Sequence, residues 1–168
     1  MPGMRRVGTR LYTPKQSHTR GVARHARRWN EQQGAIMATH AVTSQDFNQV
    51  VESNDLVFVD FWATWCGPCR REQPMLKKLE ERFAGKNICF VSVSCDQDKS
   101  AWEKVVKEEK LEGIQLYAGA FDPFMDAYMI TAIPHFILID REGKVINAKM
   151  SRPSDPETVK FLDALEGL

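Results

Sequence analysis

The sequence has few cysteines and no long apolar run. It holds four cysteines in 168 residues, Cys66, Cys69, Cys89 and Cys95, which is too sparse for a small secreted fold held together by disulfides. No apolar run approaches the roughly 20 residues that cross a bilayer as a helix. The apolar fraction of 43% and the charged fraction of 27% are close to globular averages, so we expect one folded domain with an appendage.

Charge is unevenly distributed along the chain, although the formal net charge is only +1. Residues 1–36 carry eight Lys or Arg and one acidic residue. We therefore expect a basic, disordered extension over 1–36 and a folded domain over 37–168. Arg5-Arg6 could begin a twin-arginine export signal, but the apolar stretch that such a signal needs is missing. Three interpretations of the segment remain as alternatives: an organellar transit peptide, a tail that binds nucleic acid or anionic surfaces, and a leader before a true start at Met37. With no signal or anchor recognised, a cytoplasmic location is expected, and a periplasmic or membrane-tethered one is the alternative.

Strand and helix patterns alternate from about residue 41 onward. Strands are predicted over the short, β-branched or hairpin-forming runs 56–62, 88–94, 114–117, 136–140 and 144–150. Helices are predicted over 43–51, from the Cys66 turn to Gly85 with a kink at Pro74, over 100–111, over 122–129 and onward from Asp155. Thr43, Asp122 and Asp155 are the expected helix caps. This order predicts an α/β fold with a mixed central sheet and helices on both faces.

The most informative motif is the pair Cys66 and Cys69 with Gly67-Pro68 between them. Two cysteines at this spacing can close a disulfide at a helix N-terminus, where unpaired N–H groups stabilise a thiolate. We expect an exposed Cys66 to attack and a shielded Cys69 to resolve. A zinc site is the competing interpretation, but it needs two more Cys or His ligands at suitable spacing, and His40 and His135 do not provide it.

Residues 58–69, FVDFWATWCGPC, resemble the active-site strand and turn of the thioredoxin superfamily. The resemblance extends over about residues 41–150, and Ala132-Ile133-Pro134 matches the cis-proline loop of that family. It implies that Ile133 and Pro134 hold the substrate backbone. Trp65, Gly67 and Pro68 are the other expected substrate-binding residues: Trp65 offers an apolar contact surface beside Cys66, and Gly67-Pro68 restrict the turn and tune the redox potential. Residues 95–129 and 136–146 resemble the TlpA/ResA-like branch, which implies a thioredoxin fold with a helix-containing central insertion.

Asp60 matches the buried acid of thioredoxins, in the strand just before the cysteine turn. An apolar environment raises the pKa of a carboxyl group, so Asp60 could exchange a proton with Cys69 during resolution. An exposed aspartate at the end of the strand is the alternative.

Other residues have mainly structural interpretations. Cys89 is expected in the core, and Cys95 is interpreted as structural, with an accessible thiol as the alternative. Trp62 and Trp102 are expected to pack inside. His135 follows Pro134, where thioredoxins commonly have threonine, and either modulates the cysteines or faces solvent.

The predicted function is reduction of disulfides in partner proteins by the Cys66–Cys69 pair, with no bound cofactor or metal. The Gly67-Pro68 centre resembles that of reducing family members. The expected partners are protein substrates and an upstream electron donor, either thioredoxin reductase or a membrane thiol carrier; no nucleic acid is expected, and the chain is expected to be monomeric. A peroxiredoxin-like thiol peroxidase and a non-enzymatic docking subunit are the alternatives.

Overall fold

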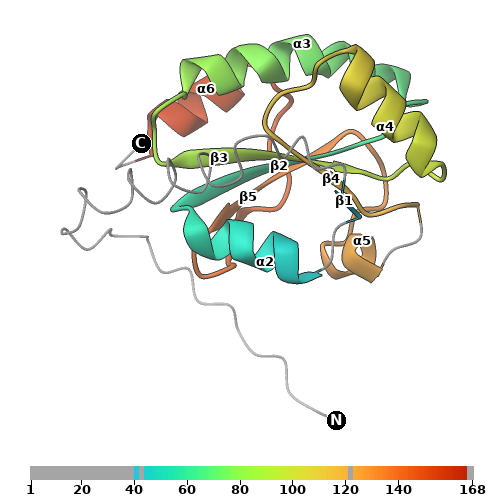
Figure 1. Cartoon of the computed structure of the whole chain (residues 1–168). Coiled ribbons are helices and arrows are strands. Elements are labelled where there is room, and N and C mark those ends of the chain that lie inside the picture. The colour runs from blue at the N-terminus through green and yellow to red at the C-terminus, as the bar shows by residue number, and fades with distance from the viewer. Residues whose placement is uncertain (1–39, 42–43, 121–122, 166–168) are drawn as a thin grey trace.

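A computed structural model describes residues 40–41, 44–120 and 123–165 of the chain. The elements, in chain order, are β1 (His40–Ala41), α2 (Ser44–Ser53), β2 (Leu56–Trp62), α3 (Gly67–Arg82), β3 (Ile88–Ser94), α4 (Lys99–Glu108), β4 (Ile114–Tyr117), α5 (Pro123–Ala127), β5 (His135–Asp140), β6 (Val145–Asn147) and α6 (Pro156–Asp163). Figure 1 shows a central sheet with α3, α4 and α6 on one face and α2 and α5 on the other.

The sheet is mixed, with the strand order β1-β4-β3-β2-β5-β6. The strands β1, β4, β3 and β2 run parallel to one another, whereas β5 runs antiparallel to β2 and to β6. Every residue of β2 is buried, as expected for a central strand covered on both faces. The carboxyl end of β2 leads into the Cys66 turn, where open α/β sheets place their functional groups.

Two hydrophobic clusters fill the two sides of the sheet, because successive strand residues point to opposite faces. The cluster under α2 contains Phe47, Val57, Val59 and Phe61, with Met125 of α5. The cluster under α3 and α6 is built from the alternate positions of the strands, with Leu76, Leu79 and Phe83 of α3 and Leu162 of α6. Position 60 therefore faces α3, the helix that carries Cys69.

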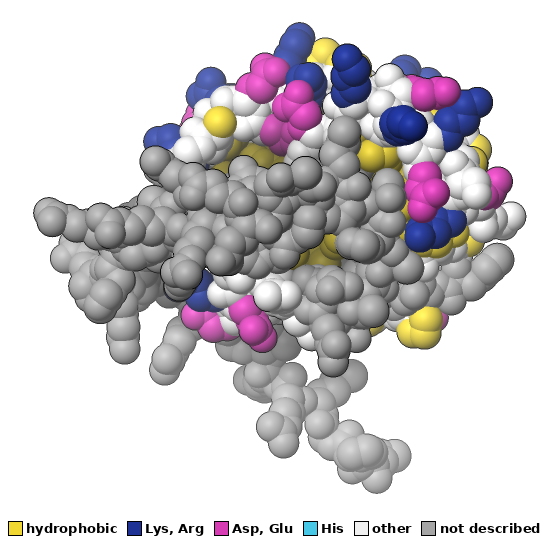
Figure 2. Space-filling model, viewed as in Figure 1, with side chains coloured by type: hydrophobic (Ala, Val, Ile, Leu, Met, Phe, Trp, Pro, Cys, Tyr) yellow, Lys and Arg dark blue, Asp and Glu magenta, His cyan; other side chains and the backbone are white. Residues whose placement is uncertain are grey.

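The outer surface of α3 and α4 is polar. Figure 2 shows Lys and Arg side chains interspersed with Asp and Glu side chains over the α3 and α4 side of the molecule. Within the described ranges, no helix is both long enough and apolar enough to cross a membrane.

The predicted fold class is confirmed, and three of the predicted strands, 56–62, 88–94 and 114–117, have the observed bounds. The second strand of the hairpin is shorter than predicted, residues 145–147 rather than 144–150. Pro74 lies inside α3, and the helix continues past it to Arg82. The expected central insertion corresponds to α4, β4 and α5, which lie between β3 and β5. The expected caps Thr43 and Asp122, and residues 1–36, lie outside the described residues.

Candidate active site

Cys66 and Cys69 form a disulfide at the N-terminus of α3, with the two sulfurs 2.02 Å apart. Cys66 is the N-cap residue, and its Sγ accepts a hydrogen bond from the backbone N–H of Cys69 at 3.2 Å. Helix N-termini favour negative charge, because their first N–H groups have no partner in the helix and the helix dipole is positive there. A thiolate on Cys66 would therefore be stabilised by the start of this 16-residue helix.

The two cysteines are more alike in exposure than the sequence analysis expected. Cys66 is 4% exposed and Cys69 is 2% exposed. The expectation of an exposed Cys66 is wrong for this oxidised form, because its side chain turns toward Cys69 and packs in a cluster with Trp62 and Trp102. The exposed apolar surface at the site is instead Trp65, which is 68% exposed.

A buried carboxylate holds the turn that precedes Cys66. Asp96 accepts hydrogen bonds from the Thr64 backbone N–H at 3.0 and 3.1 Å and from the Thr64 hydroxyl at 2.6 Å. Asp96 also accepts one from the Ser94 hydroxyl at 2.7 Å. Hydrogen bonds to an ionised group are shorter and stronger than neutral ones. Asp96 therefore fixes the turn to the end of β3, a role that the sequence analysis missed.

Asp60 lies buried in the middle of β2, 4% exposed. The pKa of its carboxyl group is raised from 3.8 to about 8, chiefly by burial. A hydrogen bond from Ser92 opposes this rise, and the negative charges of Glu80 and Glu72 contribute to it. That hydrogen bond runs from the Ser92 hydroxyl to Asp60 Oδ2 at 3.4 Å. The alternative of a solvent-exposed aspartate is therefore excluded.

A second buried acid, Glu72, lies on α3 one turn after Cys69. Its carboxylate accepts hydrogen bonds from the Ser154 backbone N–H at 3.0 Å and from the Ser154 hydroxyl at 2.9 Å. Arg152 adds a positive charge 4.0 Å away. The sequence analysis missed Glu72, although an acidic residue on the inward face of an amphipathic helix was a signal that could have identified it.

The predicted substrate-binding residues lie around the disulfide. The peptide bond between Ile133 and Pro134 is cis, as the resemblance implied, and Ile133 packs against the cluster that holds both cysteines. Gly67 and Pro68 are exposed in the first turn of α3. The structure thus brings Trp65, Gly67, Pro68 and Ile133 to the surroundings of one disulfide, while their contact with a substrate stays a prediction.

The two remaining cysteines lack the features of reactive thiols. Burial raises the pKa of Cys89 and of Cys95 to about 12, so both thiols stay protonated near neutral pH. Cys89 is half-buried rather than in the core, packed against the cluster under α2. Cys95 is buried, with its Sγ 3.4 Å from the sulfur of Met125. These positions favour the structural interpretation of both residues.

His135 is held at the start of β5 by a hydrogen bond of its ring. His135 Nε2 lies 2.7 Å from the carbonyl oxygen of Ala148, and its ring meets the ring of Phe61 edge-on. This hydrogen bond ties His135 to the chain after β6, and an effect on the cysteines stays a prediction.

In the part of the chain that the structure describes, no three His, Cys, Asp or Glu residues are grouped as metal ligands.

Comparisons with known proteins place this site in a family. A family model described as thioredoxin-like matches residues 54–145. The thioredoxin of Coprinus comatus is 43% identical over 51 residues, which are 30% of this chain and 48% of that protein. The thiol-disulfide oxidoreductase ResA of a Bacillus cereus strain is 30% identical over 122 residues, 68% of each chain. The chain spans about half to two thirds of the length of these curated relatives.

Solved structures give the same assignment. A Bacteroides vulgatus protein whose solution structure is described as that of a candidate thiol-disulfide oxidoreductase is 53% identical, with a TM-score of 0.63 over 69% of this chain and 76% of that one. The matched segment contains the sheet from β2 to β5, the cysteine pair and the cis-proline. The chain therefore belongs to the thioredoxin-like family, in its TlpA/ResA-like branch.

Proposed function

We propose that this protein reduces disulfides in partner proteins through Cys66 and Cys69. The observation that carries the proposal is the Cys66–Cys69 disulfide at the N-terminus of α3, with Cys66 Sγ accepting a backbone N–H. The family membership supports thiol-disulfide exchange as the chemistry, and the Gly67-Pro68 centre favours the reducing direction.

The reaction starts from the dithiol form of the protein. The Cys66 thiolate attacks one sulfur of the partner disulfide, so that a bond forms between Cys66 and the partner while the other partner sulfur leaves as a thiolate and takes a proton from water. The Cys69 thiolate then attacks Cys66 Sγ, and the second partner sulfur leaves with the electron pair of the broken bond. The partner gains two electrons, and the protein ends as its Cys66–Cys69 disulfide.

Asp60 is proposed to accept the proton of the Cys69 thiol during the second step. A base is most effective when its pKa is close to that of the acid it deprotonates. With its pKa raised to about 8 by burial, the Asp60 carboxyl group is near the usual thiol pKa of about 8.5. Its side chain lies on the face of the sheet covered by α3, the helix that also carries Cys69.

A trapping experiment tests the proposal. Cys69→Ser keeps the attacking sulfur but removes the resolving one, so it is expected to accumulate partner proteins as mixed disulfides that a reducing agent releases. The matched control, Cys66→Ser, keeps only the buried Cys69 thiol of the pair and is expected to trap little. Equal trapping by the two variants would contradict the assigned roles, and the identities of the trapped partners would indicate the compartment.

The direction of the reaction needs a separate measurement. The dithiol form is expected to reduce insulin disulfides repeatedly when a dithiol reagent regenerates it, whereas the disulfide form should oxidise a reduced peptide slowly. Faster peptide oxidation than insulin reduction at matched concentrations would assign the protein as an oxidase instead.

A further inference from the structure

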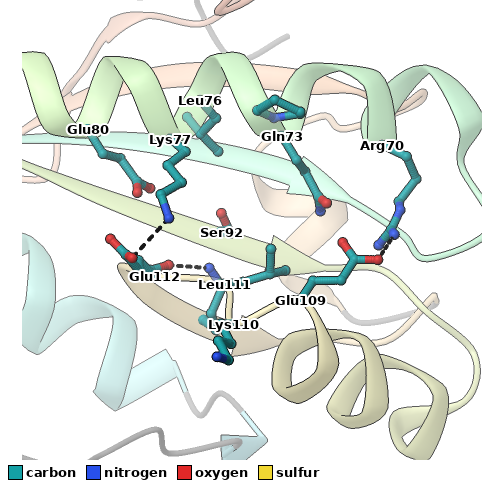
Figure 3. Close-up of a pocket in the computed structure, with 12 residues that line it drawn as sticks. Arg70, Gln73, Leu76, Lys77, Glu80, Ser92, Glu109, Lys110, Leu111 and Glu112 are labelled. Atoms are coloured by element: carbon teal, nitrogen blue, oxygen red, sulfur yellow. Dashed lines mark hydrogen bonds and ion pairs between the residues drawn. The ribbon is translucent and has the colours of Figure 1, made fainter.

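A pocket opens on the same side of the sheet as Asp60, between α3 and the segment that joins α4 to β4 (Figure 3). Its volume is about 270 Å³, far above the roughly 15 Å³ that one water molecule needs. Gln73, Lys77 and Glu80 extend into it from α3, while Glu112 lies across from them (Figure 3). Most of the residues that line the pocket are polar or charged, and the pocket is large enough to hold several waters.

Ser92 connects this pocket to Asp60. Ser92 lines the pocket although it is only 6% exposed, and its hydroxyl donates to Asp60 Oδ2 at 3.4 Å. The same hydroxyl thus contacts the buried carboxyl group on one side and the pocket on the other. Gln115 Oε1, also in the pocket lining, is buried without a hydrogen-bond partner among the described residues, and a pocket water would satisfy it.

Glu80 is an acid in the same pocket. Its Oε1 lies 3.1 Å from the place where a Cβ on Gly113 would sit, so the absence of a side chain at Gly113 leaves room for this carboxyl group. Lys77, which lies one turn earlier on α3, is paired with Glu112 at 3.0 Å. The charge of Lys77, which also acts on Glu80, is therefore shared with another acid.

We propose that Glu80 and the Ser92 hydroxyl, with water in the pocket between them, form the route by which Asp60 returns the Cys69 proton to solvent. The inference rests on the proposed function, because it assumes that Asp60 takes that proton. It assigns to Glu80 the role of a proton relay at the pocket, which acts on Cys69 only through Asp60.

Each proton movement in this route balances. Protonated Asp60 gives its proton to Ser92 Oγ while the Ser92 hydroxyl releases its own proton to a pocket water. That water passes a proton to the Glu80 carboxylate, which later loses it to bulk solvent. Asp60 ends as a carboxylate, ready to accept the next proton from Cys69, and no bond other than O–H is made or broken.

The acidities of the two groups suit this transfer. The pKa of Glu80 is raised to about 7, chiefly by burial. The negative charges of Glu112 and Glu81 add to this rise, and the positive charge of Lys77 opposes it. The pKa of Asp60 is raised to about 8 by burial, with added effects of Glu80 and Glu72. Both groups therefore change charge near neutral pH, and neither would hold a proton too strongly to pass it on.

Glu80→Gln tests the route by chemical rescue. The reduced protein is mixed with dithiobis(nitrobenzoate) at about pH 7. The Asp60 carboxyl group, with its pKa raised to about 8, is then mostly protonated at the start, so it must give up its proton through the route before it can accept that of Cys69. Cys66 attack releases a first thionitrobenzoate, and Cys69 resolution releases the second. Glu80→Gln is expected to slow the second release on the order of tenfold, less than the roughly 100-fold or more that a direct acid–base catalyst contributes, because Glu80 acts through Ser92 and water. Added imidazole, a small diffusible base, should restore the rate by carrying the proton from the pocket.

Three further variants separate the outcomes. Glu81→Gln changes an exposed neighbouring residue and should match the wild type. Ser92→Ala should slow the second release, and imidazole should not restore the rate, because the proton route is then interrupted beside buried Asp60, where imidazole has no access. Two outcomes would overturn the route and leave the role of Asp60 intact. In the first, Glu80→Gln is slow but imidazole does not rescue it. In the second, Asp60→Asn is slow while Glu80→Gln or Ser92→Ala is as fast as the wild type. A fast Asp60→Asn would overturn that role and the route together.

Discussion

Asp60 is costly to bury in its charged form. The pKa of its carboxyl group is raised from 3.8 to about 8 by burial, so folding favours the protonated form. The contribution of Asp60 to stability is fully present below about pH 4 and is lost as pH rises to the folded pKa of about 8. The contribution of Asp60 to the unfolding free energy should therefore fall over this range, because the folded protein must bury a charge.

Asp60→Asn is expected to remove this pH dependence, because an amide stays neutral. The variant should match the wild type near about pH 4 and exceed its unfolding free energy by about 3–5 kcal/mol above about pH 8. Urea unfolding at the two pH values measures the difference, with Glu81→Gln as an exposed control that should show little change. A constant difference between the two proteins across pH would contradict the buried titration.

Asp96 is a second residue whose effect can be isolated. Asp96→Asn keeps the size of the side chain but removes the charge that Thr64 and Ser94 donate to. We expect a loss of about 2 kcal/mol in unfolding free energy and slower attack by Cys66, because the turn before it is held less firmly. Urea unfolding and the rate of first thionitrobenzoate release measure the two effects.

Asp98→Asn is the matched control, since Asp98 caps α4 at an exposed position and asparagine caps helices about as well. Equal losses in the two variants would show that the position of Asp96 in the turn has no special effect.

The contiguous segment 58–69 was sufficient to identify Asp60 and both cysteines from the sequence, because their types and spacing carry the chemistry. Asp96 and Glu72 could not be predicted in the same way. Their partners Thr64 and Ser154 lie 32 and 82 residues away in the chain, so the contacts exist only after the sheet and α6 are assembled.

At the scale of elements, the central strands were the most predictable part of the fold. Strands β2 and β3 are mostly apolar, β-branched or aromatic runs, which is the pattern of a strand buried on both faces. The strand β1 has only two residues, His40 and Ala41, and therefore no periodicity to detect. The short β6 was overestimated because its pairing with β5 shifts register at Leu138 and Ile139.

Helix α6 depends on its cap. Asp155 Oδ1 accepts the backbone N–H of Glu157 at 2.9 Å, and Pro156 occupies the first turn, where its missing N–H costs nothing. Asp155→Ala is expected to lower the unfolding free energy by about 1 kcal/mol, measured by urea unfolding. Lys160→Ala, on an exposed side chain of the same helix, should change it by much less, and a larger effect of the lysine variant would contradict the capping role.

At the scale of the molecule, all the hydrophobic clusters of the described chain are built from residues between Phe47 and Leu165. We therefore predict that residues 37–168 fold and exchange disulfides without the basic segment 1–36. The shortened protein should keep its thermal midpoint within about 2 °C and release both thionitrobenzoates at wild-type rates. A large drop in the midpoint would mean that the basic segment belongs to the folded domain.

The cluster that encloses the disulfide also contains two fully buried indoles, Trp62 and Trp102. A disulfide in contact with an indole quenches its fluorescence by accepting an electron from the excited state. Emission should accordingly brighten when the Cys66–Cys69 bond is reduced. The protein thus contains an intrinsic optical reporter of its own oxidation state, which would allow each turnover to be followed without a label.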